Sequence, residues 1–292
     1  MGTSFIFRIF AFLAYNEAMI GIFDSGVGGL TVMKEIIKVL PEYDYLYLGD
    51  TARVPYGNRS REVVMKFSEE AIEWMFKRGA KLVIVACNTA SAFALRHLQD
   101  KYLVDRGPKD KKILGVIRPT VEAVIKMKFD RAGVVGTRGT INSKAYDKEF
   151  EKLGHDIKIC SAACPLLVPL IEENWYKKPE AIMILKKYLK DIKDCNVKAL
   201  ILGCTHYPLM MKDFKRIMGK RVKIVSSAEE TAKSLVDYLV RHPEIEKLLK
   251  KDKKREFCVT DSPEHFKDFA EHLMGKINKV EYVELGKKSS FY

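Results

Sequence analysis

The sequence predicts an α/β protein built from two similar domains, each with a mostly parallel sheet. Apolar, strand-like runs alternate with helix-like stretches along the chain, a pattern typical of parallel sheets covered by helices. Two of these runs, LVIV and ALILG, are followed within two residues by a cysteine, Cys87 and Cys204. A turn precedes each cysteine by a similar distance, 63 residues from Asp24 to Cys87 and 67 from Thr137 to Cys204. This spacing indicates an internal repeat.

The first half of the chain reads as strand, turn and helix units. The turn DSGVGG follows the first apolar run and permits close backbone approach by a ligand, although it lacks the dinucleotide-binding spacing. The loop GDTARVPYGNRS is too rich in glycine, proline and polar residues for regular structure. We expect strands at 19–23, 44–48 and 82–85, and helices ending before Pro41 and spanning 60–78.

The second half repeats this pattern after a charged linker, DRGPKDKK at 105–112. We expect strands at 113–116, 131–135, 198–203 and 223–225. One helix is expected to begin at Pro119, another to end at Tyr146, and two more to span 179–195 and 228–240. A strand, a helix and a further strand are expected within 256–283. The first predicted domain is discontinuous and consists of residues 19–115 and 225–292. The second consists of residues 116–224. They are related by a pseudo-two-fold axis, with the active site in the cleft between them.

Residues 1–18 are apolar and are interpreted as an extension before a plausible start at Met19. Asn16 and Glu17 interrupt the run before it reaches membrane-spanning length, so a signal peptide or membrane anchor is the less favoured reading. No membrane association is expected.

Composition favours an ordinary globular protein of about two domains with a basic surface. The net charge is +13, but lysine and arginine are spread over the helices and do not form one stripe with interleaved aromatics. A solvated basic surface is therefore favoured over nucleic-acid binding. The six cysteines have no CxxC pair and no disulfide-framework spacing, which predicts a reducing, cytoplasmic setting and no metal site.

Two cysteines at equivalent strand ends suggest a reaction that needs two opposed thiols. Inverting a stereocentre by proton transfer is such a reaction, because a planar carbanion loses a proton on one face and gains one on the other. A thiol with an ordinary pKa of about 8.5 can be tuned for this acid and base work. Without a second catalytic signal, each cysteine alone would equally suit a buried core position.

The neighbouring residues suit the same task. His206 lies two residues after Cys204, and Asp24 ends the first predicted strand, so each can assist one thiol. Each is equally interpretable as a helix cap or surface residue when taken singly. Neutral donors that could hold substrate carboxylates come from Asn88, Thr89, Thr137, Thr140 and Thr205 and from the backbone near Ser25 and Gly57.

The chain also carries a family resemblance, over residues 20–231. Its motifs, in order, are GIFDSGVGGLTV, GDTARVPYGNRS, VACNTASAFAL, GVIRPTVEA, VVGTRGTINSKAY, ACPLLVPLIEE and LGCTHYPL. Together they resemble the glutamate racemases of the aspartate/glutamate racemase family. Aspartate and hydantoin racemases share the two-cysteine plan but differ at the first glycine turn and the second cysteine motif. Asn174 departs from the family, which often has glycine there.

The resemblance implies cofactor-independent proton transfer at the α-carbon of glutamate, supplying D-glutamate for peptidoglycan, and a homodimer. It implies that Cys87 handles the proton of D-glutamate and Cys204 that of L-glutamate. Asp24 would assist Cys87, and His206, supported by Glu172, would assist Cys204. Substrate contacts would come from Asp24, Ser25, Pro55, Tyr56, Gly57, Asn88, Thr89, Thr137, Thr140, Thr205 and His206.

Three alternatives remain open from the sequence. A racemase of the same family could act on another amino acid, such as aspartate. A thiol-based redox or acyl-transfer enzyme would need one nucleophile, or two thiols within disulfide reach. A nucleic-acid-binding protein would show steeply salt-dependent binding and would not need the cysteines.

Overall fold

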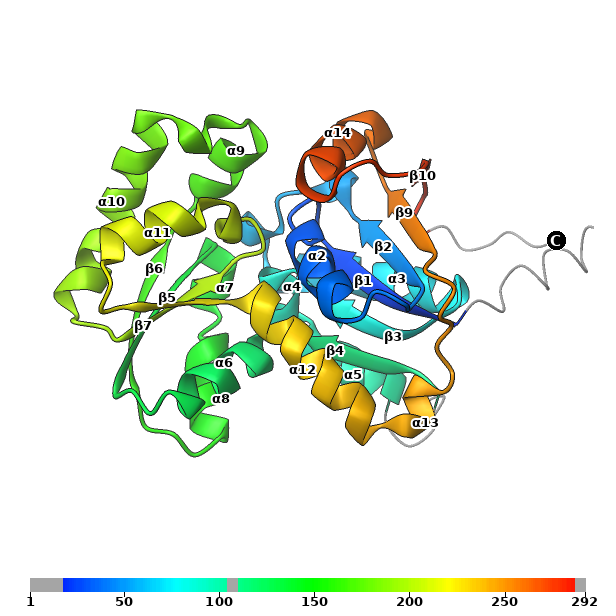
Figure 1. Cartoon of the computed structure of the whole chain (residues 1–292), viewed down its shortest axis with the longest axis horizontal. Helices are drawn as coiled ribbons and strands as arrows, with labels where there is room; N and C mark the ends of the chain where they lie inside the picture. The colour runs from blue at the N-terminus through cyan, green and yellow to red at the C-terminus, as the bar shows by residue number, and fades with distance from the viewer. Residues whose placement is uncertain (1–17, 104–109, 287–292) are drawn as a thin grey trace, which may run out of the picture.

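The computed structural model describes residues 18–103 and 110–286, which form two parallel sheets (Figure 1). The first sheet has the strand order β10-β9-β2-β1-β3-β4 and the second has the order β6-β5-β7-β8. Every pair of neighbouring strands is parallel. We call each sheet with its helices the first unit and the second unit. The predicted α/β class with two mostly parallel sheets is confirmed.

The strands of the first sheet are β1 (Met19–Asp24), β2 (Tyr45–Gly49), β3 (Ala80–Val85), β4 (Lys112–Gly115), β9 (Arg255–Val259) and β10 (Val280–Tyr282). Those of the second are β5 (Arg131–Gly136), β6 (Lys158–Ala163), β7 (Ala199–Gly203) and β8 (Lys223–Ser226). The order β2-β1-β3-β4 therefore recurs as β6-β5-β7-β8, and β9 and β10 extend only the first sheet. The two cysteine-bearing segments follow the third strand of this shared order, β3 and β7.

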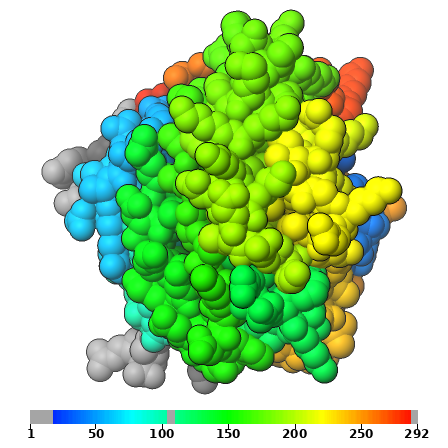
Figure 2. Space-filling view, turned by 90° about the vertical axis from the view of Figure 1, so that its left-hand side faces the viewer, coloured from blue at the N-terminus to red at the C-terminus, as the bar shows by residue number. Residues whose placement is uncertain are grey.

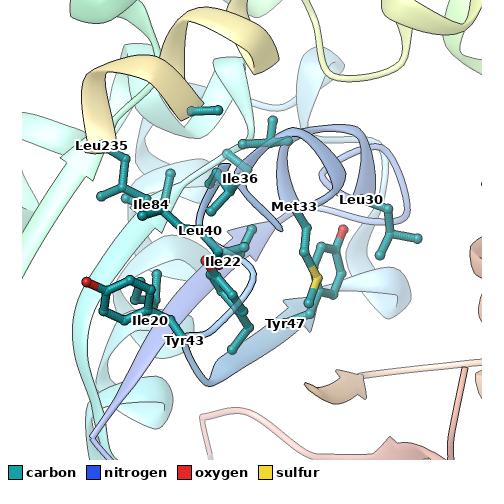
Figure 3. Packing of buried hydrophobic residues seen from close by; sticks show 14 of the residues in the cluster. Ile20, Ile22, Leu30, Met33, Ile36, Leu40, Tyr43, Tyr47, Ile84 and Leu235 are labelled. Carbon is teal, nitrogen blue, oxygen red and sulfur yellow. Dashed lines mark hydrogen bonds between the residues drawn. The ribbon is translucent and has the colours of Figure 1, made fainter. Parts of the chain in front are cut away.

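Both faces of the first sheet are buried, which explains its nearly continuous apolar strands. Side chains alternate along a strand, so every second residue faces the same side of the sheet. On one side, Ile20, Ile22 and Ile84 face α2 (Leu30–Val39), α12 (Ser227–Arg241) and α14 (Pro263–Met274). Figure 3 shows this packing for α2 and α12. Val83 and Val85 of β3 face α3 (Arg61–Lys77) and α5 (Leu95–Leu103) on the opposite side.

The second sheet is covered in the same way. Ala199 and Ile201 face α6 (Ile117–Lys126) and α8 (Ala145–Lys152), whereas Leu200 and Leu202 face α9 (Leu167–Glu172), α10 (Pro179–Asp194) and α11 (Met211–Met218). Seen from the side of this unit, its segments cover most of the visible surface and the first unit shows only at the edges (Figure 2).

The remaining helices are α4 (Asn88–Phe93), α7 (Arg138–Asn142) and α13 (Pro243–Glu246), with 3-10 turns at Thr51–Arg53, Tyr56–Asn58, Trp175–Lys177 and Tyr207–Met210.

The helix predicted to run through Tyr146 is wrong in one respect, because it is divided into α7 and α8. Lys144, between them, has φ 54°, in the left-handed region that a continuous helix excludes. The Ser143 hydroxyl accepts a hydrogen bond from the Ala145 amide at 3.1 Å, which satisfies a free donor at the start of α8. The break redirects the chain so that Tyr146 enters the interior.

One disulfide was not anticipated by the prediction of a reducing setting. Cys160, in β6, is bonded to Cys195, which caps the end of α10. The two residues are 35 positions apart, so only the packing of α10 against β6 brings them together, and no spacing rule indicates the pair. Cys87, Cys164, Cys204 and Cys258 are free.

The chain passes between the units twice, after β4 and after β8. The predicted division at 115/116 and 224/225 remains a proposal; β8 continues the second sheet to Ser226. The predicted N-terminal extension and most of the predicted linker fall at 1–17 and 104–109, outside the described residues. Within the described part, no helix has both the length and the apolar character needed to cross a membrane.

Candidate active site

The carboxyl ends of β3 and β7 bring the two predicted thiols to one cavity. Cys87 lies two residues beyond the end of β3, and Cys204 directly follows β7. Both are nearly buried, with 6% and 5% of their surface exposed, and both line the same cavity. Ligands of open parallel sheets bind at this edge, so the cavity is the candidate active site.

Most of the predicted site residues line this cavity. They are Ser25, Pro55, Tyr56, Gly57, Cys87, Asn88, Thr89, Thr137, Glu172, Cys204, Thr205 and His206. Asp24 and Thr140 lie directly behind the lining. The Thr140 hydroxyl is 3.2 Å from that of Thr89 and 3.1 Å from that of Thr137. Sequence reasoning missed four lining residues, Gly26, Val54, Val168 and Gly203.

The surroundings of Cys87 favour the neutral thiol. Cys87 caps α4, and its Sγ accepts a hydrogen bond from the Ala90 amide at 3.5 Å and lies 3.5 Å from Ser25 Oγ. Burial and then the negative charge of Asp24 raise the pKa of Cys87 to about 12, against the smaller opposing effects of the Ser25 and Ala90 contacts. At neutral pH, Cys87 therefore holds its proton.

Asp24 influences Cys87 by charge and holds two loops together by hydrogen bonds. Its Oδ2 accepts from the Gly26 amide at 3.0 Å, and its Oδ1 accepts from the Thr205 hydroxyl of the second unit at 3.4 Å. Complete burial raises the pKa of Asp24, although the charge of His206 and amide hydrogen bonds oppose this. The carboxyl group thus connects the glycine-rich turn to the segment after Cys204.

The surroundings of Cys204 are cationic. Its Sγ lies 3.8 Å from His206 Nδ1, and His206 Nε2 lies 2.9 Å from Glu172 Oε1. Burial would lower the pKa of His206, but the hydrogen bonds and charges of Cys204 and Glu172 outweigh it and raise the pKa to about 10. An imidazolium at neutral pH stabilises a thiolate beside it, so this pair is suited to accept a proton.

Glycine at position 28 allows the two halves of the site to touch. A β-carbon on Gly28 would lie 2.4 Å from Thr205 Oγ1 and 2.5 Å from His206 Nδ1, so no side chain fits there. The neighbouring Thr31 hydroxyl contacts the carbonyl oxygens of Gly28 and Thr205, at 2.9 and 2.8 Å. Sequence reasoning missed Thr31, and its contact with Thr205 spans 174 residues.

The loop that carries Pro55, Tyr56 and Gly57 is fixed by Asp50, which is fully buried. Asp50 Oδ2 accepts a hydrogen bond from the Tyr56 hydroxyl and from Arg53 Nε, and Oδ1 accepts from the Thr260 hydroxyl at 2.9 Å. The Val54-Pro55 peptide bond is cis. Asp50 was also missed, because one of its partners, Thr260, is 210 residues away and meets the loop only in the folded protein.

Among the described residues, no group of three histidine, cysteine or acidic side chains is arranged to hold a metal ion.

The chain is similar to known proteins over most of its length. A model of the Asp/Glu/hydantoin racemase family matches residues 20–235. A glutamate racemase of Geobacter metallireducens is 42% identical over 268 residues, 91% of this chain and 96% of that protein. One of Thermoanaerobacter sp. is 38% identical over 92% of this chain and 98% of that protein.

Solved structures agree in fold. A glutamate racemase isoform of Bacillus anthracis has a TM-score of 0.83 at 39% identity, covering 92% of this chain and 98% of that one. The Francisella tularensis glutamate racemase in complex with D-glutamate has a TM-score of 0.82 at 34% identity, covering the same shares of each chain. An aspartate racemase of Picrophilus torridus has a TM-score of 0.55 at 18% identity, covering 76% of this chain and 94% of that one. At this identity, the likeness shows the fold alone. The chain therefore belongs to the Asp/Glu/hydantoin racemase family and is an isomerase.

Proposed function

We propose that the protein is a glutamate racemase that interconverts L- and D-glutamate by proton transfer between two cysteines, without a cofactor. The observation that carries this proposal is the delivery of Cys87 and Cys204 into one cavity from equivalent strand ends. Relatives of about 40% identity that are named glutamate racemases support glutamate as the substrate.

In the proposed reaction from L- to D-glutamate, the Cys204 thiolate takes the α-proton. Cys87, as the thiol, then gives its proton to the opposite face of the planar carbanion, and the thiol and thiolate have exchanged roles. The raised pKa of Cys87 and the cationic His206 beside Cys204 favour the protonation state that begins this direction. The reverse reaction begins from the exchanged state.

Neutral donors are proposed to hold the two substrate carboxylates. Among the described residues, the cavity lining contains no lysine or arginine, and its serine and threonine hydroxyl groups come from Ser25, Thr89, Thr137 and Thr205, with that of Thr140 behind them. We assign substrate contacts also to Asn88 and to the segment Pro55, Tyr56 and Gly57. Hydroxyls and backbone amides can bind carboxylates in a site from which water is excluded.

We further propose that the D-glutamate serves peptidoglycan synthesis, that the protein works in the cytoplasm, and that it forms a homodimer. These three proposals rest on the family resemblance. The Cys160–Cys195 disulfide is the one described feature that an assignment to a reducing compartment has to accommodate.

The decisive experiment incubates the purified protein with L-glutamate in heavy water without added cofactor. We expect D-glutamate that carries deuterium at the α-carbon, measured by chiral chromatography and mass spectrometry. L-Aspartate serves as the competing substrate. Absence of racemisation and of exchange by the folded protein would refute the proposal, and racemisation of aspartate in preference to glutamate would redirect it within the family.

A further inference from the structure

Tyr146 lies between the residues that adjoin the two thiols. Its hydroxyl donates a hydrogen bond of 2.7 Å to Asn88 Oδ1, and Asn88 directly follows Cys87. Its ring lies against Gly203, which directly precedes Cys204: a β-carbon on Gly203 would be only 3.2 Å from Tyr146 Cε2. One side chain of the second unit thus contacts both cysteine-bearing segments.

Asn88 continues this contact toward the other thiol. Its Nδ2 lies 3.4 Å from Ser227 Oγ, and the Ser227 hydroxyl donates to the carbonyl oxygen of Leu202 at 3.3 Å. Leu202 belongs to β7, two residues before Cys204. Both ends of the Asn88 carboxamide are therefore bonded to groups that are fixed relative to the second sheet.

The position of Tyr146 is itself well determined. It is 2% exposed and lies in the first turn of α8, directly after the backbone break at Lys144. A buried phenol in a fixed hydrogen bond has little freedom, and an unpaired Asn88 oxygen would be costly in the interior. Burial and this hydrogen bond together restrict the position of the Tyr146 ring between the units.

We propose that Tyr146 is a positioning residue that sets the separation of the Cys87 and Cys204 thiols across the cavity. This inference rests on the proposed two-cysteine racemase function. Tyr146 is not among the described residues that line the cavity. It acts through Asn88 on the segment of Cys87 and through Gly203 on the segment of Cys204.

The test compares Tyr146→Phe with a matched control, Tyr45→Phe. Tyr45 is equally buried and donates a hydrogen bond of 2.7 Å to the Leu40 carbonyl, but within the first unit and away from the cavity. We expect Tyr146→Phe to lower kcat roughly ten- to hundredfold for both enantiomers, with KM changed less than about twofold, because proton transfer is sensitive to small misplacements. The α-deuterium isotope effect on kcat should rise, and Tyr45→Phe should change neither.

The outcomes separate the two proposals. If the wild-type protein does not racemise glutamate, the proposed function fails. If the wild type is active and folded Tyr146→Phe keeps its kcat and isotope effect, even with a lower melting temperature, Tyr146 is only structural and the inference is wrong. If Tyr146→Phe does not fold, Ser227→Ala decides: a raised isotope effect supports the inference, and an unchanged one overturns it.

Discussion

The half of the site around Cys87 and the half around Cys204 share a scaffold but differ in chemistry. Each cysteine follows the third strand of the same four-strand order. Cys87 has a buried carboxyl, Asp24, and a neutral hydroxyl nearby, whereas Cys204 has a histidine bonded to Glu172. A repeated backbone can thus place two identical groups at equivalent positions while the adjacent side chains surround them with different charges.

This difference is one of charge near the thiol. Burial, and then the negative charge of Asp24, raise the pKa of Cys87 to about 12, and this favours a proton donor. A pKa of about 10 for His206 keeps a positive charge beside Cys204 and favours a proton acceptor. Variants that change one half of the site at a time therefore test whether the two thiols differ in this way.

The largest effect is expected from removing either thiol. Cys87→Ala and Cys204→Ala should each lower racemisation about 10²- to 10⁴-fold, the usual contribution of a general acid or base. In heavy water, Cys87→Ala should still exchange the α-proton of L-glutamate through Cys204 but not that of D-glutamate. Cys204→Ala should show the opposite preference, as measured by NMR of each enantiomer.

Cys258→Ala is the control for this experiment, because Cys258 is a free, buried cysteine of β9 that does not line the cavity. It should keep the wild-type rate. Full racemisation by either catalytic variant, or equal exchange of both enantiomers by each, would contradict the two-sided arrangement.

A smaller effect is expected from Glu172→Gln, and it should depend on pH. The charge of Glu172 helps to raise the pKa of His206, so its removal lowers that pKa. The imidazolium is then lost at a lower pH, and the basic limb of the kcat/KM profile should move down by roughly one to two pH units. Glu173→Gln changes an exposed neighbour and should leave the profile in place. An unshifted basic limb in Glu172→Gln would separate His206 from the activity.

Removal of the disulfide, which lies in the second unit, is expected to have the smallest effect on catalysis. Its effect on stability is expected to be larger. The double variant Cys160→Ser/Cys195→Ser opens a 35-residue loop that contains α9 and α10. We expect unfolding of this unit to become easier by about 3 to 4 kcal/mol, because the unfolded chain regains freedom. Racemisation at 25 °C should change little, since Leu167 and Ile171 still bury α9. Denaturant unfolding with and without reductant measures the effect, and equal midpoints would refute it.

Local patterns were sufficient to predict much of the molecule. The alternation of apolar runs and helical stretches predicted the class, and the spacing of two cysteines predicted the repeat. Motif resemblance predicted most of the cavity lining. Asn174, which departs from the family's frequent glycine, has φ 58°, a left-handed conformation that asparagine tolerates better than most residues.

What the sequence could not reveal depends on contacts between distant segments. Thr31 meets Thr205, Asp50 meets Thr260, and Cys160 meets Cys195 only after the helices pack on their sheets. None of these residues belongs to a periodic pattern that marks its partner. The break at Lys144 was hidden for a related reason, because lysine seldom adopts the left-handed conformation that the fold requires there.

The two passages of the chain between the units, after β4 and after β8, have a mechanical consequence (Figure 1). Two covalent connections define a line, and rotation about that line is the relative motion that stretches neither of them. Hydrogen bonds that cross between the units, such as Thr31 to Thr205 and Tyr146 to Asn88, oppose such a rotation in this structure. For the cavity to open, these hydrogen bonds would have to break, and forming them again would return the two thiols to the same alignment.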